Sequence, residues 1–432
     1  MVVLSERAAI RRLHDRLAFG ARPGELDRSV VRGFDSVAAA LLTGPGGSPD
    51  AVSSPPPELP PVPAVEVDDP RRPAADRMKE DQQRLLRLWW LDRMTAAEDP
   101  CAEKLTWFWH GHFATSEAKV DYPDLVLAQN ETLRAHVRGD FRAMTRAMVV
   151  DAALVYWLDG QANLVGAANE NLGRELMELF TLGLGHYGET DVKEASRALT
   201  GWTIDPDLRV TEFDPGRWDP GAKTVLGRTG ELDAVGLVDV LVARPESADF
   251  VIGRLWARLV SSTPPSAGTR DVLRRAYGPA TDLRALLAAI VGAPEFRDGA
   301  SVLVKQPVEW AIGLMRAVGV RAVALTDDEA DHLVIALQSL GQLPFRPPSV
   351  GGWPDGIAWL TPSANLDRLT VARLVLSRAD LRPPTSGRLD WARDVLGVET
   401  WSARTATALD RLDEPRELLA VAAISPEYVV SG

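Results

Sequence analysis

The sequence predicts a mainly α fold, a single large multi-helical domain with long Pro/Gly-rich loops and at most a small β-hairpin. Apolar residues recur with the 3.6-residue spacing of helices along most of the chain, and the ends of these segments carry helix-capping residues. No alternation of strands and helices indicates a parallel sheet. The composition, 46% hydrophobic and 25% charged, is typical of a globular protein, and the length is enough for one large domain or two medium ones. We expect residues 1–432 to form one domain.

The N-terminal region begins with two predicted helices and a long loop. Residues 6–17 form the first helix, with Ser5 as its N-cap, and glycine and proline residues separate it from the second, residues 25–42. Proline, glycine and serine then replace helical periodicity over residues 45–73. We interpret this segment as a Pro-rich loop insertion within the domain, either solvated or folded over a cleft as a flap.

The central region is predicted to be helical with short interruptions. Asp99-Pro100 is a helix start signal, and Gly111 predicts where that helix ends. The other helices predicted here are residues 76–97, 123–138, 141–150, 152–158, 169–180 and 191–200. Residues 202–230 contain too much proline and glycine for helices, and we expect a short hairpin formed by residues 209–213 and 224–226.

The C-terminal half is again helical, apart from a Pro-, Gly- and Trp-rich loop at residues 344–362. Its predicted helices are residues 236–243, 248–259, 269–276, 282–291, 308–318, 327–340, 365–378, 389–396, 403–412 and 415–424. Two of these helices are followed by a small residue and then Pro-Glu-aromatic, at residues 293–296 and 425–428. We interpret this motif as a reused helix terminator, with an internal duplication as the alternative.

Charge and cysteine content limit the classes of function. The formal net charge of −12 argues against nucleic-acid binding, which needs a concentrated basic surface. The single cysteine, Cys101, excludes an intrachain disulfide and is interpreted as a small buried hydrophobe. Charged residues in the first 21 positions argue against a secretory signal, and no window reaches the ~18 uncharged apolar residues of a membrane span. We therefore expect a cytoplasmic protein without nucleic-acid or membrane partners.

Residues 169–180 contain the densest group of hydrogen-bonding side chains. On a helix, Asn171, Arg174, Glu175 and Glu178 share one face, and leucines form an apolar stripe beside them. One interpretation is a catalytic or ligand-binding carboxylate pair, with Arg174 orienting an anion or keeping one glutamate ionised. The alternative is a buried Arg–Glu pair that only stabilises packing.

His110 and His112 are candidate ligands of a divalent transition metal or proton-transfer groups. Residues i and i+2 lie about 200° apart on an intact helix, so the two rings converge only if the helix ends at Gly111. Glu175 and Glu178 are candidates to complete the ligand set. The alternative places His110 at the negative end of its helix and His112 in a tryptophan-lined core.

Asp219 and Lys223 lie in a polar loop that we expect to fold over the helix at residues 169–180. Lys223 is a candidate contact for a phosphate or carboxylate, and the alternative is an ordinary surface lysine. Neither a phosphate-binding GxxxxGK[ST] loop nor a GxSxG nucleophile motif is present.

Five segments of the chain resemble the bacterial family called domain of unknown function 1800. They are residues 13–20 (LHDRLAFG), 108–113 (FWHGHF), 171–179 (NLGRELMEL), 191–202 and 350–356 (VGGWPDG). The resemblance covers nearly the whole chain in the right order. It implies a mainly helical fold without an agreed activity; many members resemble secreted proteins and are encoded beside a family related to alkaline phosphatases and sulfatases.

The chain departs from this family at two positions. Members usually carry histidines where this chain has Phe180 and Trp218, whereas His110 and His112 are kept. If four histidines build a metal or proton-transfer site in the family, this chain has lost half of it. It is then either a degenerate homologue or one in which carboxylates have taken over.

The leading hypothesis is a cleft in which Glu175, Glu178, Arg174, Asp219 and Lys223, with His110 and His112, perform metal-assisted or acid/base chemistry on a small polar or saccharide-like substrate. The alternative is a non-catalytic binding or scaffold protein with a structural polar network. In that case the tryptophan-rich loop, with Trp353 and Trp359, faces a protein partner.

Overall fold

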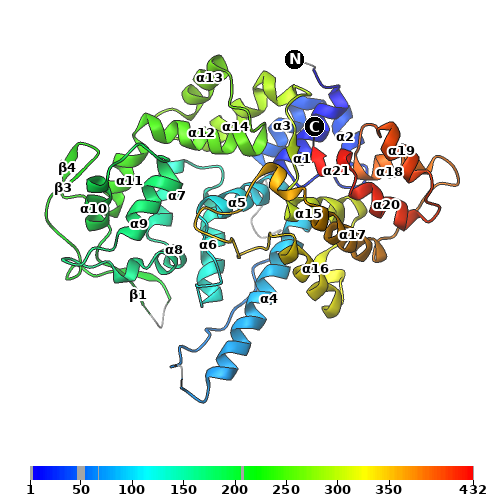
Figure 1. Cartoon of the computed structure of the whole chain (residues 1–432). Coiled ribbons are helices and arrows are strands. Elements are labelled where there is room, and N and C mark those ends of the chain that lie inside the picture. Colours follow the sequence, from blue (N-terminus) through cyan, green and yellow to red (C-terminus); the bar gives the residue numbers. More distant parts are fainter. Residues whose placement is uncertain (1–2, 46–53, 67, 206–208, 432) are drawn as a thin grey trace.

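The computed structural model describes residues 3–45, 54–66, 68–205 and 209–431 and confirms the mainly α fold (Figure 1). The helices of the first half are α1 (Glu6–Leu17), α2 (Glu25–Arg32), α3 (Phe34–Thr43), α4 (Arg72–Ala96), α5 (Pro100–His112), α6 (Pro123–His136), α7 (Phe141–Val149), α8 (Ala152–Trp157), α9 (Glu170–Glu175) and α10 (Glu189–Ala198). Among the described residues, no helix is both long and apolar enough to cross a membrane.

The second half continues as a series of helices of similar length. They are α11 (Ala234–Val242), α12 (Pro245–Leu259), α13 (Ala267–Tyr277), α14 (Leu283–Gly292), α15 (Pro307–Val318), α16 (Asp327–Ser339), α17 (Pro362–Ser377), α18 (Arg388–Leu396), α19 (Ala403–Leu409), α20 (Pro415–Ala423) and α21 (Pro426–Val429). Short 3₁₀ turns are η1 (Gly160–Ala162), η3 (Pro294–Arg297), η4 (Ala322–Ala324) and η5 (Gly356–Trp359), and η2 (Leu176–Thr181) is a π-helix.

Two of the helix boundaries that differ from the prediction involve a glycine. The predicted helix over residues 25–42 is split at Gly33, whose φ of 80° no α-helix accommodates. Conversely, α5 does not end at Gly111 but continues to His112. An isolated glycine weakens a helix by only about 1 kcal/mol relative to alanine, so packing on both sides of α5 overrides it.

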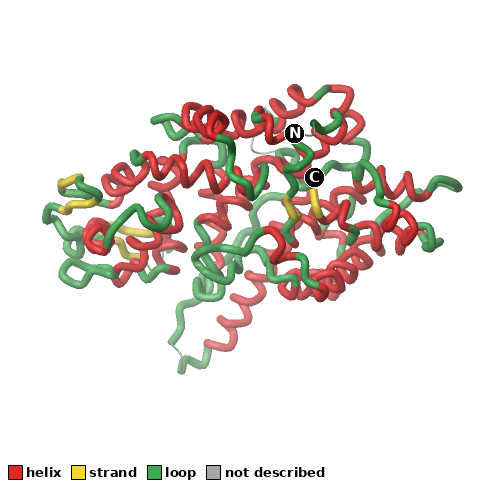
Figure 2. The backbone as a smooth tube through the Cα atoms, turned by 45° about the horizontal axis from the view of Figure 1, so that its top comes forward, coloured by secondary structure: helices red, strands yellow, loops and turns green. Residues whose placement is uncertain are grey.

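The strands form three antiparallel two-stranded sheets in the described parts of the chain. β1 (Trp202–Ile204) pairs with β2 (Thr211–Phe213), and β3 (Lys223–Val225) pairs with β4 (Arg228–Gly230). The predicted pairing of residues 209–213 with 224–226 is therefore wrong, because each segment pairs with a nearer strand. β5 (Leu303–Val304) pairs with β6 (Val430–Ser431) beside the C-terminus (Figure 2).

Two hydrophobic clusters meet at α5. Trp109 and Phe113 belong to the cluster built with α1, α3 and α7 to α14, whereas Trp107 belongs to the cluster built with α4 and α15 to α21. In Figure 1, α7 to α11 and α15 to α20 lie on opposite sides of α5 and α6. The two faces of α5 therefore contact different cores.

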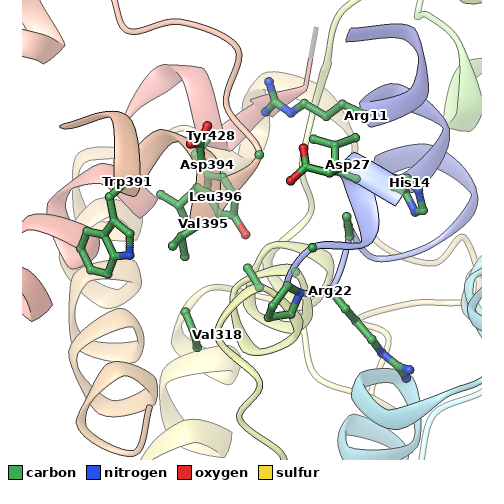
Figure 3. A pocket seen from close by; sticks show the side chains of 18 of the residues that line it. Arg11, His14, Arg22, Asp27, Val318, Trp391, Asp394, Val395, Leu396 and Tyr428 are labelled. Atoms are coloured by element: carbon green, nitrogen blue, oxygen red, sulfur yellow. The ribbon is translucent and has the colours of Figure 1, made fainter. Parts of the chain in front are cut away.

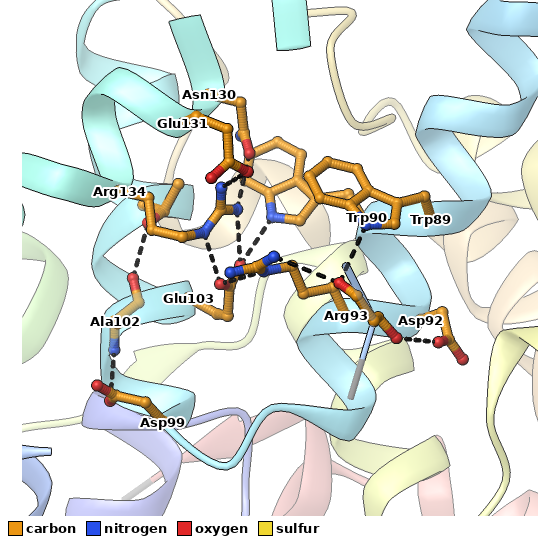
Figure 4. A network of polar contacts seen from close by, with 12 residues as sticks. Trp89, Trp90, Asp92, Arg93, Asp99, Ala102, Glu103, Asn130, Glu131 and Arg134 are labelled. Carbon is orange, nitrogen blue, oxygen red and sulfur yellow. Dashed lines mark hydrogen bonds and ion pairs between the residues drawn. The ribbon is translucent and has the colours of Figure 1, made fainter. Parts of the chain in front are cut away.

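Glu103 ties α5 to the helices on either side (Figure 4). Its carboxylate accepts hydrogen bonds from Nε of Arg93 on α4 and Nε of Arg134 on α6, both at 2.7 Å, and from the indole of Trp90 at 3.1 Å. Burial raises the pKa of Glu103, but Arg134 and Arg93 more than offset this effect and lower it overall. The carboxylate is thus a buried, ionised crosslink.

The glutamates of the two Pro-Glu-aromatic motifs make equivalent hydrogen bonds. Glu295 accepts hydrogen bonds from the backbone N–H of Ser266 and the hydroxyl of Thr269, at the start of α13. Glu427 accepts the equivalent bonds from Ser402 and Thr405, at the start of α19. Each glutamate thus joins the end of its helix to the start of the helix before it.

The Pro-rich loop lies along α4. Residues 46–53 and 67 of the predicted insertion fall outside the described residues. In the rest, the carbonyl of Pro60 accepts a hydrogen bond from Gln82 (2.7 Å), and that of Ser54 accepts one from Trp89 (3.2 Å). The loop ends earlier than predicted because α4 begins at Arg72, with a proline in its first turn.

Candidate functional site

The helix predicted over residues 169–180 forms as α9 followed directly by the π-helix η2. Leu172 and Leu176 are buried, whereas Asn171 is exposed. The predicted division into an apolar and a polar face is therefore present. A π-turn within a helix occurs often at functional sites and changes the angular spacing of the side chains that follow.

Arg174 pairs with partners that the sequence did not suggest. Its Nη2 atom lies 2.8 Å from a carboxylate oxygen of Glu189 on α10 and 3.1 Å from one of Glu170. The side chains of Arg174 and Glu189 are 33% and 70% exposed. The expectation of a buried Arg–Glu pair is therefore wrong, because this pair lies on the surface.

Glu175 and Glu178 lie close enough to influence one another. Burial and the charge of Glu178 both raise the pKa of Glu175, and Arg174 opposes them. Glu178 accepts a hydrogen bond from the hydroxyl of Tyr187 at 2.6 Å. The predicted carboxylate pair therefore exists as a partly exposed group with a phenol beside it.

His110 and His112 point to opposite sides of α5. The His110 ring packs against Trp90, with ring centroids 5.1 Å apart, and its Nε2 accepts a hydrogen bond from the N–H of Phe345. The His112 ring lies in the other cluster, and its Nε2 donates to the carbonyl of Phe180 at 2.9 Å. Because α5 runs on through Gly111, the convergence expected of the two rings does not occur.

Burial lowers the pKa of each of these histidines to about 3, so both are neutral at physiological pH. Within the described ranges, no three His, Cys, Asp or Glu side chains are grouped so that they could hold a metal ion. The geometry therefore gives the expected metal role no support. Phe180 lies beside His112, whereas Trp218 packs on Lys223, so the four family positions are not gathered around one point.

Asp219 and Lys223 are fixed to α10 rather than folded over α9. Arg197 donates two hydrogen bonds to the Asp219 carboxylate, at 2.7 and 3.1 Å. Lys223 donates to the carbonyl of Asp219 and lies 4.5 Å from the ring centroid of Trp218. Since Lys223 is fully buried, its interpretation as a surface lysine is wrong. Glu189 and Arg197 are eight positions apart, so roughly 12 Å of α10 separates this group from Arg174.

The tryptophans of the loop at residues 344–362 face inward. Trp353 stacks on Trp107 of α5 with ring centroids 5.0 Å apart, and Trp359 is only 4% exposed. The expectation that both face a protein partner is wrong for the buried Trp359, whereas for Trp353, which is only partly buried, it stays a prediction.

A cavity that the sequence did not single out lies between α1, α15 and α18 (Figure 3). Its volume is about 730 Å³, within the range of small-molecule sites. In Figure 3, Arg11 and Asp27 lie on one side and Trp391 and Asp394 on the other, with Val318 below. Charged and apolar side chains from distant parts of the chain thus surround one space.

The floor of this cavity is an ion pair covered by an aromatic ring. Oδ1 of Asp15 lies 3.2 Å from Nζ of Lys305, which in turn lies 4.0 Å from the ring centroid of Tyr428. Arg11 lies 3.6 Å from the other carboxylate oxygen. Lys305 follows β5 and Tyr428 precedes β6, so the pairing of these two strands brings them together.

The surroundings of the floor residues determine their protonation states. Burial raises the pKa of Asp15, but Lys305, Arg11 and Arg16 reverse this effect and lower it below its usual value. Burial and the charge of Asp15 raise the pKa of Tyr428, which keeps its phenol protonated. The floor therefore offers an ionised carboxylate, an ammonium group and a neutral phenol.

The walls contain hydrogen-bonding groups that the protein does not use. None of the described residues accepts a hydrogen bond from the hydroxyl of Tyr428 or the indole N–H of Trp391.

Other polar groups around the cavity have partners within the protein. His14 forms a hydrogen bond with Ser29 through Nε2 at 2.9 Å, and burial lowers the pKa of His14. On the rim, Arg7 pairs with Asp27 at 2.6 Å.

Sequence reasoning missed this cavity because its parts are distant in the chain. Asp15 lies in the segment LHDRLAFG, and Tyr428 ends the repeated Pro-Glu-aromatic motif. Both segments carry recognisable motifs, but nothing in the sequence shows that β5 and β6 pair. Lys305 carries no local signal of its own.

The chain matches one family model. The model described as "Protein of unknown function (DUF1800)" covers residues 12–430. The comparisons with curated proteins and with solved structures give no match.

Proposed function

The chain belongs to the DUF1800 family of proteins of unknown function, and from that premise we propose that it binds a small, hydroxyl-rich, saccharide-like molecule in the cavity between α1, α15 and α18. The observation that carries the proposal is the Tyr428 hydroxyl. It belongs to a side chain that is only 2% exposed, lines the cavity and has no hydrogen-bond partner among the described residues. Buried polar groups are normally satisfied, so a ligand oxygen is its natural partner.

The composition of the walls favours a neutral polyol over a strongly charged ligand. Arginines at 7, 11, 22 and 382 are matched around the cavity by aspartates at 15, 27, 380, 390 and 394. A hydroxyl both donates and accepts hydrogen bonds, so it suits walls that present both guanidinium donors and carboxylate acceptors. Trp391 and Tyr428 add apolar ring surface, against which the C–H face of a sugar packs.

Binding fits this floor better than acid/base catalysis does. A general acid or base works best with a pKa near the operating pH. The pKa of Asp15 is instead lowered, and that of Tyr428 is raised. Both groups therefore keep their protonation states at neutral pH and serve as a fixed acceptor and a fixed donor.

A panel of neutral mono- and disaccharides tests the proposal by ligand-observed saturation-transfer NMR. Val318→Trp places a large ring in the cavity from α15 and should obstruct it, whereas Val323→Trp makes the same change at a site that is 72% exposed and does not line it. We expect one or more sugars to receive saturation from the wild type and from Val323→Trp but not from folded Val318→Trp. No transfer to any sugar, or equal transfer with both variants, contradicts the proposal.

A second candidate function is acid/base chemistry at Glu175 and Glu178, favoured by the raised pKa of Glu175 and the phenol of Tyr187 beside Glu178. It predicts that hydrolysis of a glycoside panel is lost in Glu175→Gln and kept in Glu170→Gln, which changes a neighbouring carboxylate that pairs with Arg174. Absence of hydrolysis in the wild type, or equal loss in both variants, contradicts this candidate.

A further inference from the structure

A second, smaller pocket lies between α5, α12 and the loop that contains Trp353. Its volume is about 110 Å³, which exceeds the space that a single water needs. The stacked rings of Trp107 and Trp353 form one wall, and Gly111 of α5 lies beside the Trp353 ring. Two arginines of α12, Arg254 and Arg258, form the other wall.

The two arginines differ in what they bind. Arg258 lies 2.6 Å from the carboxylate of Glu309, which Lys104 also contacts at 2.7 Å. Arg254 has neither an ion pair within 4.0 Å nor a hydrogen bond to any described residue, although it is partly buried. Burial and the neighbouring charge of Arg258 lower the pKa of Arg254, while Asp355 opposes them.

Asp355 shows that this pocket already accommodates a carboxylate. Its Oδ1 atom accepts a hydrogen bond from Gln306 at 3.0 Å and lies 3.7 Å from Nη1 of Arg258. The side chain is nevertheless 72% exposed, so it occupies only the edge of the pocket. The guanidinium of Arg254 therefore remains available to an oxyanion that enters from solvent.

The loop that closes the pocket has little freedom to move away. A Cβ atom on Gly352 would lie 2.3 Å from the carbonyl oxygen of Gly111, and Gly352 has a φ of +81°. Only glycine permits this approach of the loop backbone to α5. The contact holds the loop that carries Trp353 and Asp355 against α5.

From this geometry we propose that the pocket between α5, α12 and Trp353 is a binding site for a small oxyanion, a carboxylate or phosphate group held by Arg254. A guanidinium presents five donors in a planar fork that matches either group in a bidentate manner. The site is separate from the cavity between α1, α15 and α18 and does not depend on the function proposed for it.

Titration of the protein with inorganic phosphate and, separately, with acetate tests this site by isothermal calorimetry at constant ionic strength. We expect saturable binding of at least one ion, weakened at least about tenfold by Arg254→Gln. Arg244→Gln, which changes an exposed arginine just before α12, leaves the affinity unchanged. Asp355→Asn removes a competing carboxylate, so we expect it to strengthen binding.

The phosphate and acetate arms separate the two sources of the oxyanion. Preference for phosphate indicates a phosphorylated ligand, and preference for acetate a carboxylic acid. Val318→Trp, which obstructs the larger cavity, should leave ion binding intact. Binding of neither ion, or equal affinities in the wild type and Arg254→Gln, overturns the proposal.

Discussion

Nζ of Lys305 lies 3.2 Å from Oδ1 of Asp15, across nearly three hundred residues of chain and on the floor of the cavity between α1, α15 and α18. Both side chains are at most 10% exposed. The pair joins α1 to the segment between β5 and α15, so it belongs both to the fold and to the proposed binding site. Its removal should therefore affect stability in a defined way.

Lys305→Met should destabilise the protein by about 3–5 kcal/mol, because it removes the cation whose charge acts most strongly on the buried Asp15 carboxylate and leaves only the weaker influence of Arg11 and Arg16. The double variant Asp15→Asn/Lys305→Met removes both charges and should be less destabilised than the sum of the single changes. Urea denaturation of the four proteins measures this coupling. Strict additivity would show that the two charges do not interact.

Acid should destabilise the protein because two buried histidines resist protonation. The pKa values of His110 and His112 are about 3 in the folded state, against about 6.5 in an unfolded chain. Between these values the unfolded state binds more protons, so the free energy of unfolding falls as the pH falls from 6.5 towards 3. Each histidine contributes about 1.4 kcal/mol per pH unit within that window.

His110→Phe should reduce this slope by about 1.4 kcal/mol per pH unit, even though it also removes the acceptor of the Phe345 N–H. Denaturation in urea at several pH values between 4 and 6.5 measures the slope. His332→Gln, which changes an exposed residue of α16, is the control. A slope unchanged by His110→Phe contradicts the assigned protonation.

Gly352→Ala should be more destabilising than Gly356→Ala. Both residues have positive φ, +81° and +64°, so either alanine costs about 1–2 kcal/mol of backbone strain. Only at Gly352 does the added Cβ collide with a backbone atom, the carbonyl oxygen of Gly111, which should add roughly 1–3 kcal/mol. Thermal denaturation compares the two, and equal losses would indicate that the loop yields freely.

Glu175→Gln should change stability by less than about 0.5 kcal/mol, because Glu175 makes no ion pair within the described residues and its charge is repelled by Glu178. Glu103→Gln should cost about 3–5 kcal/mol, because it leaves the buried Arg93 without a carboxylate and Arg134 with only the partly exposed Glu131. Chemical denaturation of both variants measures the difference. A large loss in Glu175→Gln would indicate a structural partner for that residue.

The helical fold could be predicted from the sequence because its signals are local. Ser5, Asp99 and Asp282 cap helices in the structure as their residue types suggest. The break at Gly33 and the continuation through Gly111 could not be distinguished, since tertiary packing decides whether a glycine is tolerated in a helix.

The polar face at Glu175 was also predictable, because helical spacing alone places those side chains together. The residues that these and other charged side chains bind could not be predicted. Arg174 binds Glu189 through the packing of α9 on α10, and Lys305 meets Asp15 through strand pairing near the C-terminus. Contacts of this kind depend on the topology of the chain, which composition and periodicity do not encode.

The proposed function is tested most directly by showing that a bound sugar lies in the cavity between α1, α15 and α18. Ser386→Cys lines the cavity and Val323→Cys does not, and each can carry a trifluoromethyl tag read by fluorine NMR. The native Cys101 should not react, because it is fully buried and burial raises the pKa of its thiol to about 11. We predict that a sugar found by the saturation-transfer screen shifts the resonance at position 386 saturably and leaves that at position 323 unchanged. A saturating sugar that shifts neither resonance, or both equally, would contradict binding in this cavity.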